Sequence, residues 1–194
     1  GTDRRTASER IARNLLEDAL SFVRDKNAAL FVTTFSSHIA RLKSIVEFGK
    51  KTHRQIIFLG RSLNKYVNCA HEVGLCPFYK QIKILKYRKQ INSFLKRLEH
   101  ERGKYLIVCT GHQAEPGSIL DRLVKGETPF KFHSGDHVIF SSSVIPVEIN
   151  IKAREQMDNR LKKVGVRIQT DIHVSGHGGR EDLRDLVAML NPEH

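Results

Sequence analysis

The sequence contains no tryptophan and has only three cysteines among its 194 residues. Cys69, Cys76 and Cys109 are odd in number and form no CxxC pair, which argues against a disulfide framework and against a CxxC zinc or redox motif. No apolar run is long enough to span a bilayer, and we expect no signal peptide. These absences predict a cytoplasmic protein with reduced thiols and no membrane function.

Several widespread catalytic signatures are also missing. The sequence has no Walker A motif, no GxGxxG motif and no GxSxG nucleophile elbow. It has no pair of acidic residues placed for general acid–base chemistry. The chain is therefore not expected to be a P-loop NTPase, a dinucleotide-binding domain or a serine hydrolase.

Positive charge is what the sequence has in excess. The 33 lysines and arginines against 21 acidic residues give a net charge of +12, which indicates a polyanionic partner, with nucleic acid first and a solubilising surface as the alternative. Apolar residues alternate with the basic ones over residues 80–104, so we expect a strand and a helix with one basic face. The basic residues of this segment are Lys80, Lys83, Lys86, Arg88, Lys89, Lys96, Arg97, Arg102 and Lys104.

Short apolar runs alternate with amphipathic segments along the chain. Strands are expected at residues 28–33, 55–59, 81–85, 105–110, 137–141 and 166–172. Helices are expected at residues 6–26, 36–49, 63–70, 90–102, 119–124, 150–164 and 182–190. The repeated strand–loop–helix order predicts an α/β fold with a doubly wound, mostly parallel sheet and helices on both faces.

Five loops would follow the carboxyl ends of these strands, at the edge where open parallel sheets bind ligands. All five are rich in glycine, serine, histidine or threonine, and they span residues 34–38, 60–62, 110–113, 141–143 and 173–179. Each loop alone is an ordinary turn. Together they predict a binding edge with hydroxyl and backbone N–H donors.

The most informative loop is residues 173–179, HVSGHGG, which separates an apolar stretch from a helix. Its glycines allow close approach of a ligand and the helix N-terminus favours an anion, so His177 is expected to contact a phosphate or transfer a proton. His173 and His177 have the HxxxH spacing of a zinc chelate, but the glycines argue against a helix there. A purely structural histidine is the third alternative.

Three other groups have an ordinary explanation beside a functional one. Residues 133–137, HSGDH, resemble part of a metal cluster, although a β-turn before a strand is favoured. Residues 60–62 either clamp a phosphate through Arg61 or form a loop with a surface arginine. Residues 141–143 either donate hydroxyls to a ligand backbone or end a polar strand.

Most aromatic residues lie in apolar runs, so no base-stacking surface is expected, with Phe35 the best exception.

Taken together, these loops resemble the ribonuclease J family, with an archaeal character. Residues 110–120 (TGHQAEPGSIL) resemble its TGxQGEPxSxL signature, residues 135–146 (GDHVIFSSSVIP) its GDxVxFSSSxIP segment, and residues 173–177 its HxSGH loop. Residues 35–41 and 60–62 match its FASNxHR and GRS segments more loosely. The family consists of metallo-β-lactamase-fold nucleases with an inserted β-CASP domain. The resemblance implies a β-CASP domain at residues 1–165 and a piece of the metallo-β-lactamase domain at residues 166–194.

The activity that the resemblance implies is zinc-dependent cleavage of single-stranded, 5′-monophosphorylated RNA, from 5′ to 3′ and sometimes internally. Two Zn²⁺ ions would activate the attacking hydroxide. The family's zinc-binding HxHxDH motif is absent from this sequence, so we expect no metal ligands in this chain and no catalysis by it alone. The implied partners are RNA and the metallo-β-lactamase domain of the same protein. A homodimer is a further hypothesis, because without that domain the chain would expose a domain interface.

The same resemblance assigns residues to the RNA. His177 is expected at the scissile phosphate, and His173, Ser175, Gly176 and Gly178 are expected around a phosphate, with the 5′-terminal one as first candidate. The RNA channel would be lined by Ser36, His38, Arg41, Gly60, Arg61, Ser62, Gly111, His112, Gln113, Glu115, Ser141, Ser142 and Ser143.

Ala114 departs from the family pattern, and three alternative functions stay open. Ala114 stands where the family has glycine, which bears on how closely the backbone approaches RNA. The alternatives are a cleavage-and-polyadenylation-type or DNA-repair β-CASP nuclease, a non-catalytic RNA-binding module, and an α/β domain that binds a nucleotide.

Overall fold

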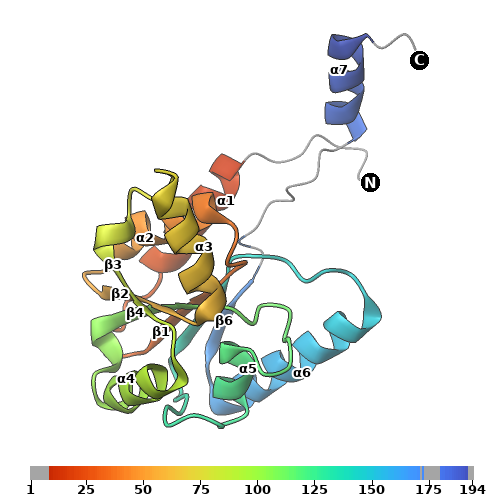
Figure 1. Ribbon diagram of the computed structural model, residues 1–194. Coiled ribbons are helices and arrows are strands. Elements are labelled where there is room, and N and C mark those ends of the chain that lie inside the picture. The colour runs from red at the N-terminus through yellow and green to blue at the C-terminus, as the bar shows by residue number, and fades with distance from the viewer. Residues whose placement is uncertain (1–8, 171, 173–179, 192–194) are drawn as a thin grey trace.

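The computed structural model describes residues 9–170, 172 and 180–191. Its centre is one parallel sheet with the strand order β3-β2-β4-β1-β5-β6 (Figure 1). The predicted α/β class and parallel sheet are confirmed. The strands are β1 (Leu30–Thr33), β2 (Gln55–Leu59), β3 (Ile82–Leu85), β4 (Tyr105–Cys109), β5 (His137–Phe140) and β6 (Arg167–Gln169).

Helices cover both faces of this sheet, as predicted (Figure 1). One face carries α1 (Glu9–Ser21), α2 (Ile39–Lys50) and α3 (Arg61–Glu72), and the other carries α4 (Arg88–His100), α5 (Ile119–Val124) and α6 (Glu148–Val164). The last helix is α7 (Arg180–Leu190), and short 3-10 turns at Tyr79–Gln81 and Arg102–Lys104 precede β3 and β4.

The continuous apolar runs form strands because both of their faces are buried. In β1, Leu30 and Val32 join the core beneath α1, α2 and α3, whereas Phe31 joins the core beneath α4, α5 and α6. All five residues of the central strand β4 are buried. A strand with two covered faces needs apolar side chains at every position, which is why these segments do not alternate with polar residues.

Several element boundaries differ from the sequence-based expectation, and the helix expected over residues 6–26 ends already at Ser21. The helix expected from residue 36 begins at Ile39, because the preceding residues form a turn in which the His38 N–H donates to the Phe35 carbonyl (3.3 Å). β6 pairs with β5, with Ile168 in register with Val138, and it is shorter than the strand expected over residues 166–172. The domain boundary expected at residue 165 stays a prediction. Among the described residues, no helix is long and apolar enough to cross a membrane.

Candidate nucleic-acid interface

The loops after β1, β2, β3 and β4 meet at the carboxyl edge of the sheet and enclose two adjoining hollows. The larger has a volume of about 560 Å³, and the smaller has a volume of about 320 Å³. We call them together the rim groove, because both are lined by Ser62, Thr110, Gly117 and Ser118. The larger hollow adds Gly60, Arg61, Lys86, Tyr87, Arg88, Ile91, Ile119 and Arg122, and the smaller adds Phe35, Ser36, His112, Glu115 and Pro116.

The electrostatics of the rim groove favour an anion. Arg61 is the first residue of α3 and Arg88 is the first residue of α4, and neither helix has an acidic residue in its first turn. The N-termini of both helices therefore bring backbone N–H groups and partial positive charge to the same hollow. Lys86 and Arg122 add two more cations, and Glu115 is the one acidic residue among the lining residues.

Two glycines shape the walls of this groove. Gly111 has a φ of +122°, and a Cβ atom there would lie 2.6 Å from Ser118 Oγ and 2.7 Å from Leu120 Cβ. Ser118 Oγ accepts a hydrogen bond from the Asp121 N–H (3.2 Å) at the start of α5. Only glycine allows the loop after β4 to fold this closely onto α5. Gly60, with a φ of +118°, likewise makes the sharp turn from β2 into α3.

Some predicted RNA contacts are buried and hold the loops in place. Arg41 has no exposed surface, and its Nη1 donates to the carbonyl (2.9 Å) and hydroxyl (2.8 Å) oxygens of Ser141 and to the Ile172 carbonyl (3.0 Å). Thr34 Oγ1 donates to the same Ser141 carbonyl (3.3 Å). Arg41 and Ser141 therefore hold the ends of β1 and β5 together, and their expected place in the lining of an RNA channel stays a prediction.

The loop after β4 is fixed in the same way. The side chain of Gln113 donates to the Ser143 carbonyl (2.9 Å) and accepts from the Ile145 N–H (2.8 Å), so it ties this loop to the one after β5. His112 is buried with its ring edge against Phe35, 4.0 Å between ring centroids. Its carbonyl accepts from Arg154 Nη1 (3.0 Å). Both residues hold the loop after β4 in place, and of the two only His112 is among the residues that line the rim groove.

The other predicted residues fall into three groups. Gly60, Arg61, Ser62, Ser36 and Glu115 line the rim groove. Gly111 and Ser142 are buried, Ser143 is exposed, and His38 is half-buried just before α2. The residues expected around the phosphate lie outside the described residues: His173, Ser175, Gly176, His177 and Gly178.

The site residues expected from the sequence did not include several residues that line the groove, among them the cations Lys86, Arg88 and Arg122 and the aromatic Tyr87. Lys86, Tyr87 and Arg88 directly follow β3, and that position after an expected strand was the available signal. Tyr87 is 56% exposed, and Lys86 Nζ lies 4.7 Å from the centroid of its ring. The groove therefore has an accessible aromatic ring, although the sequence suggested that the aromatics belong to the core.

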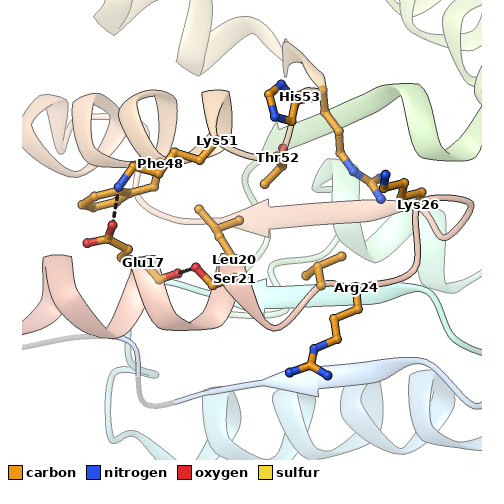
Figure 2. A pocket seen from close by; sticks show the side chains of 11 residues that line it. Glu17, Leu20, Ser21, Arg24, Lys26, Phe48, Lys51, Thr52 and His53 are labelled. Atoms are coloured by element: carbon orange, nitrogen blue, oxygen red, sulfur yellow. Dashed lines mark hydrogen bonds and ion pairs between the residues drawn. The ribbon is translucent and has the colours of Figure 1, made fainter.

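A third hollow, of about 320 Å³, lies at the opposite, amino-terminal edge of the sheet (Figure 2). It is also lined by basic residues, but these serve the fold: Lys51 pairs with Glu17, as Figure 2 shows. Arg54 donates to the carbonyls of Ala28 (2.7 Å) and Asp25 (3.0 Å). Burial lowers the pKa of Arg54. Lys51 is thus engaged by a carboxylate and Arg54 by backbone carbonyl groups, so these two cations stabilise the fold around the hollow.

The HSGDH segment lies at this amino-terminal edge, and the predicted β-turn is confirmed. Gly135 has a φ of +88°, and the Asp136 N–H donates to the His133 carbonyl (3.2 Å). The Asp136 carboxylate accepts from the N–H groups of Ala29 (2.8 Å) and His133 (2.7 Å) and pairs with Arg102. Burial lowers the pKa of His137. No group of three metal-ligating side chains occurs within residues 9–170, 172 and 180–191.

Comparison with known proteins identifies the family to which this chain belongs. Residues 27–161 match the family model described as ribonuclease J, beta-CASP domain. The chain belongs to the ribonuclease J β-CASP family. The matched region of this ribonuclease J domain contains every residue that lines the rim groove.

Several ribonuclease J proteins are similar over most of the chain. The ribonuclease J of Methanocaldococcus jannaschii is 42% identical over 191 residues, which cover 98% of this chain and 43% of that protein. The one from Pyrococcus abyssi is 42% identical over 190 residues, with 98% and 42% covered. The one from Thermus thermophilus is 33% identical over 168 residues, with 84% and 27% covered. The chain thus spans less than half the length of these relatives, and the resemblance noted in the sequence is confirmed.

Proposed function

We propose that this chain is the RNA-binding β-CASP part of a zinc-dependent ribonuclease J, and that its rim groove holds the sugar–phosphate backbone of single-stranded RNA. One observation carries the proposal: Arg61, Lys86, Arg88 and Arg122 converge on one hollow together with the N-termini of α3 and α4. Nucleic-acid affinity comes mainly from such phosphate contacts, which position the strand without reading its sequence.

The polar neighbours of these cations suit a ribose–phosphate chain. Arginine forks hydrogen-bond two phosphate oxygens at once. Ser62 and Thr110 add hydroxyl groups in both hollows, where they can meet phosphate oxygens or 2′-hydroxyls. Phe35 is exposed in the smaller hollow and Tyr87 in the larger one, and both offer flat surfaces to unpaired bases. This combination favours a single strand over a small nucleotide.

We propose that hydrolysis itself belongs to the full-length enzyme. Within residues 9–170, 172 and 180–191 no group of side chains forms a ligand set for Zn²⁺, and we expect the isolated chain not to cleave RNA. His177 is proposed to contact the scissile phosphate, with His173, Ser175, Gly176 and Gly178 around a phosphate. Arg41 would act as a positioning residue, because it holds the Ile172 carbonyl directly before His173.

The segment after β6 is proposed to contribute to the metallo-β-lactamase domain. Its helix α7 buries none of its residues, and the exposed apolar side chains are Leu183, Leu186, Val187, Met189 and Leu190. Such an apolar stripe fits contact with another domain of the same protein.

We further propose that the full-length enzyme degrades 5′-monophosphorylated RNA from 5′ to 3′, with some internal cleavage. We also propose that this enzyme is a homodimer and lies in the cytoplasm.

The test is fluorescence anisotropy of the 194-residue chain with single-stranded RNA carrying a 5′-monophosphate or a 5′-hydroxyl, across a salt series. Affinity should fall with salt, with a logarithmic slope of about −0.7 for each phosphate contacted. The double variant Arg61→Ala/Arg88→Ala should make this slope shallower by about 1.4 for two lost contacts. The matched control is Lys162→Ala/Lys163→Ala, which removes two exposed charges from the last turn of α6.

The outcomes separate the parts of the proposal. Equal losses in the groove and control variants would overturn the groove as the RNA site. Equal binding of both RNAs would overturn a 5′-monophosphate preference within this chain and leave a backbone-binding groove. Cleavage of RNA by the metal-free chain would overturn the view that hydrolysis needs the rest of the enzyme.

A further inference from the structure

The basic residues near the outer strand β3 divide into two classes. Arg97, Arg102 and Lys104 form ion pairs with Glu99 or Glu101. Between Glu72 and Glu99 the sequence has no acidic residue at all. Within the part of the chain that the structure describes, no ion pair engages the five cations nearest to β3 in the sequence, which are Lys80, Lys83, Lys86, Arg88 and Lys89. These five charges are therefore available to a ligand.

Three of these cations, Lys80, Lys83 and Lys86, are spaced along β3 from one end to the other. β3 is the outer strand of the sheet and pairs with β2 only. Ile82 and Ile84 pack against the core beneath α1, α2 and α3, and Lys83 between them is exposed. Lys80 lies in the 3-10 turn before β3, and Lys86 follows β3 and lines the rim groove. The four residues of β3 span roughly 13 Å, at about 3.3 Å per residue.

Aromatic rings lie at both ends of this strand. At the carboxyl end, Tyr87 is exposed and also lines the rim groove. At the amino end, the exposed His71 ring lies flat on the Tyr79 ring, with 3.9 Å between centroids and 3° between planes. Tyr79 Oη donates to Asn68 Oδ1 (2.8 Å), which fixes the orientation of the pair. Both ends thus present a ring on which a base can stack.

We infer that single-stranded RNA leaves the rim groove at Tyr87 and continues over the outer strand β3. Its phosphates would meet Lys86, Lys83 and Lys80, and its bases would stack on Tyr87 and on the His71–Tyr79 pair. A cationic path combined with aromatic rings is how proteins hold single strands without reading their sequence. This inference rests on the proposed function, because the path begins in the rim groove. We call this path over β3, from Tyr87 to the His71–Tyr79 pair, the track. If RNA follows the track, its affinity should increase with RNA length.

The closing experiment compares uridine oligonucleotides of 5 and 20 nucleotides by fluorescence anisotropy with the 194-residue chain. The track variant is Lys80→Gln/Lys83→Gln, and the control variant is Lys162→Gln/Lys163→Gln, on α6 beside the other outer strand. At ~0.1 M salt the track variant should bind the long RNA about tenfold more weakly, with a salt slope shallower by about 1.4. The affinity of the track variant for the short RNA should change by less than about twofold, because the short RNA does not reach the track. The affinity of the control variant for the long RNA should also change by less than about twofold, because Lys162 and Lys163 lie outside the track.

Stacking is tested separately with Tyr87→Ala and Tyr87→Phe. The alanine variant should weaken long-RNA binding by about fivefold or more, and phenylalanine should retain it, because every base stacks on an aromatic face. If the track and control double variants lose the same affinity for long RNA, the track is wrong while the rim groove stands. If the unaltered chain binds neither RNA, the proposed function itself fails, and the track fails with it.

Discussion

Arg41 and Ser141 are one hundred positions apart in the sequence, and their hydrogen bond joins α2 to the residue after β5 at the carboxyl edge of the sheet. One guanidinium nitrogen of Arg41 reaches both oxygens of Ser141 and also the Ile172 carbonyl, while the side chain has no exposed surface. The contact therefore links the start of α2 to the end of β5 and to the residue directly before His173. Its role within this chain is structural, because it fixes the Ile172 carbonyl against the end of β5.

Replacing Arg41 by alanine should lower the free energy of unfolding by about 3 kcal/mol, because buried carbonyl groups that lose their donor cost about 1–3 kcal/mol each. Urea denaturation followed by circular dichroism measures the change. Arg160→Ala, an exposed arginine on α6, is the control and should stay within about 0.5 kcal/mol. An Arg41→Ala variant as stable as the control would show that these hydrogen bonds do not hold the edge together.

Gly111→Ala should be more damaging than Gly117→Ala, although both glycines have positive φ values, +122° and +75°. The alanine methyl at 111 would meet Ser118 Oγ at 2.6 Å and Leu120 Cβ at 2.7 Å, whereas nothing lies within 4 Å of the site at 117. Gly117→Ala should cost about 1–2 kcal/mol of backbone strain. The difference between the two, measured by denaturation, isolates the steric contact. Equal losses would mean that α5 shifts freely away from the loop.

Stability should fall as the pH drops below about 6.5, the ordinary pKa of histidine, partly because of His137. Burial in β5 lowers the pKa of His137, with Arg167 and Arg54 nearby adding to the effect. The unfolded chain then binds a proton that the folded chain does not, so stability is retained above the unfolded pKa and lost as the pH falls through it. Unfolding free energies between pH 7 and pH 5 measure this slope.

The control for this pH dependence is a second histidine substitution. His137→Gln should flatten the slope between pH 7 and pH 5, because the titrating group is gone. His100→Gln, at an exposed position at the end of α4, should leave the slope as it is in the unaltered chain. Identical slopes in all three proteins would exclude His137 as a source of the acid sensitivity.

The strands that sequence reasoning located best are those buried on both faces. β1, β2, β4 and β5 consist of unbroken apolar runs, and their predicted positions are confirmed to within about two residues at each end. β3 was harder to interpret, because an outer strand carries polar residues such as Lys83. The start of α2 was misplaced because a turn at Phe35 and His38 takes up the first residues of the expected helix.

The site was less predictable than the fold, because its residues are brought together by the strand order. β2 lies between β3 and β4 in the sheet, so the loop containing Lys86 and Arg88 lies beside those containing Arg61 and Ser118. No spacing along the chain reveals this. Burial was equally hidden: an arginine near the start of a helix is normally exposed, but Arg41 in α2 is buried and donates hydrogen bonds to residues 100 and 131 positions away.

The three cysteines should differ sharply in reactivity. Burial raises the pKa of the Cys109 thiol to about 12, with Glu115 adding to the effect, and burial also raises the pKa of Cys76. Because the thiolate is the reactive species, a maleimide at pH 7 should modify exposed Cys69 within minutes and leave the other two unmodified until the chain unfolds. Mass spectrometry of the native and urea-unfolded chain counts the labels. Prompt labelling of Cys109 would mean that the centre of the sheet opens readily, since Cys109 ends the central strand β4.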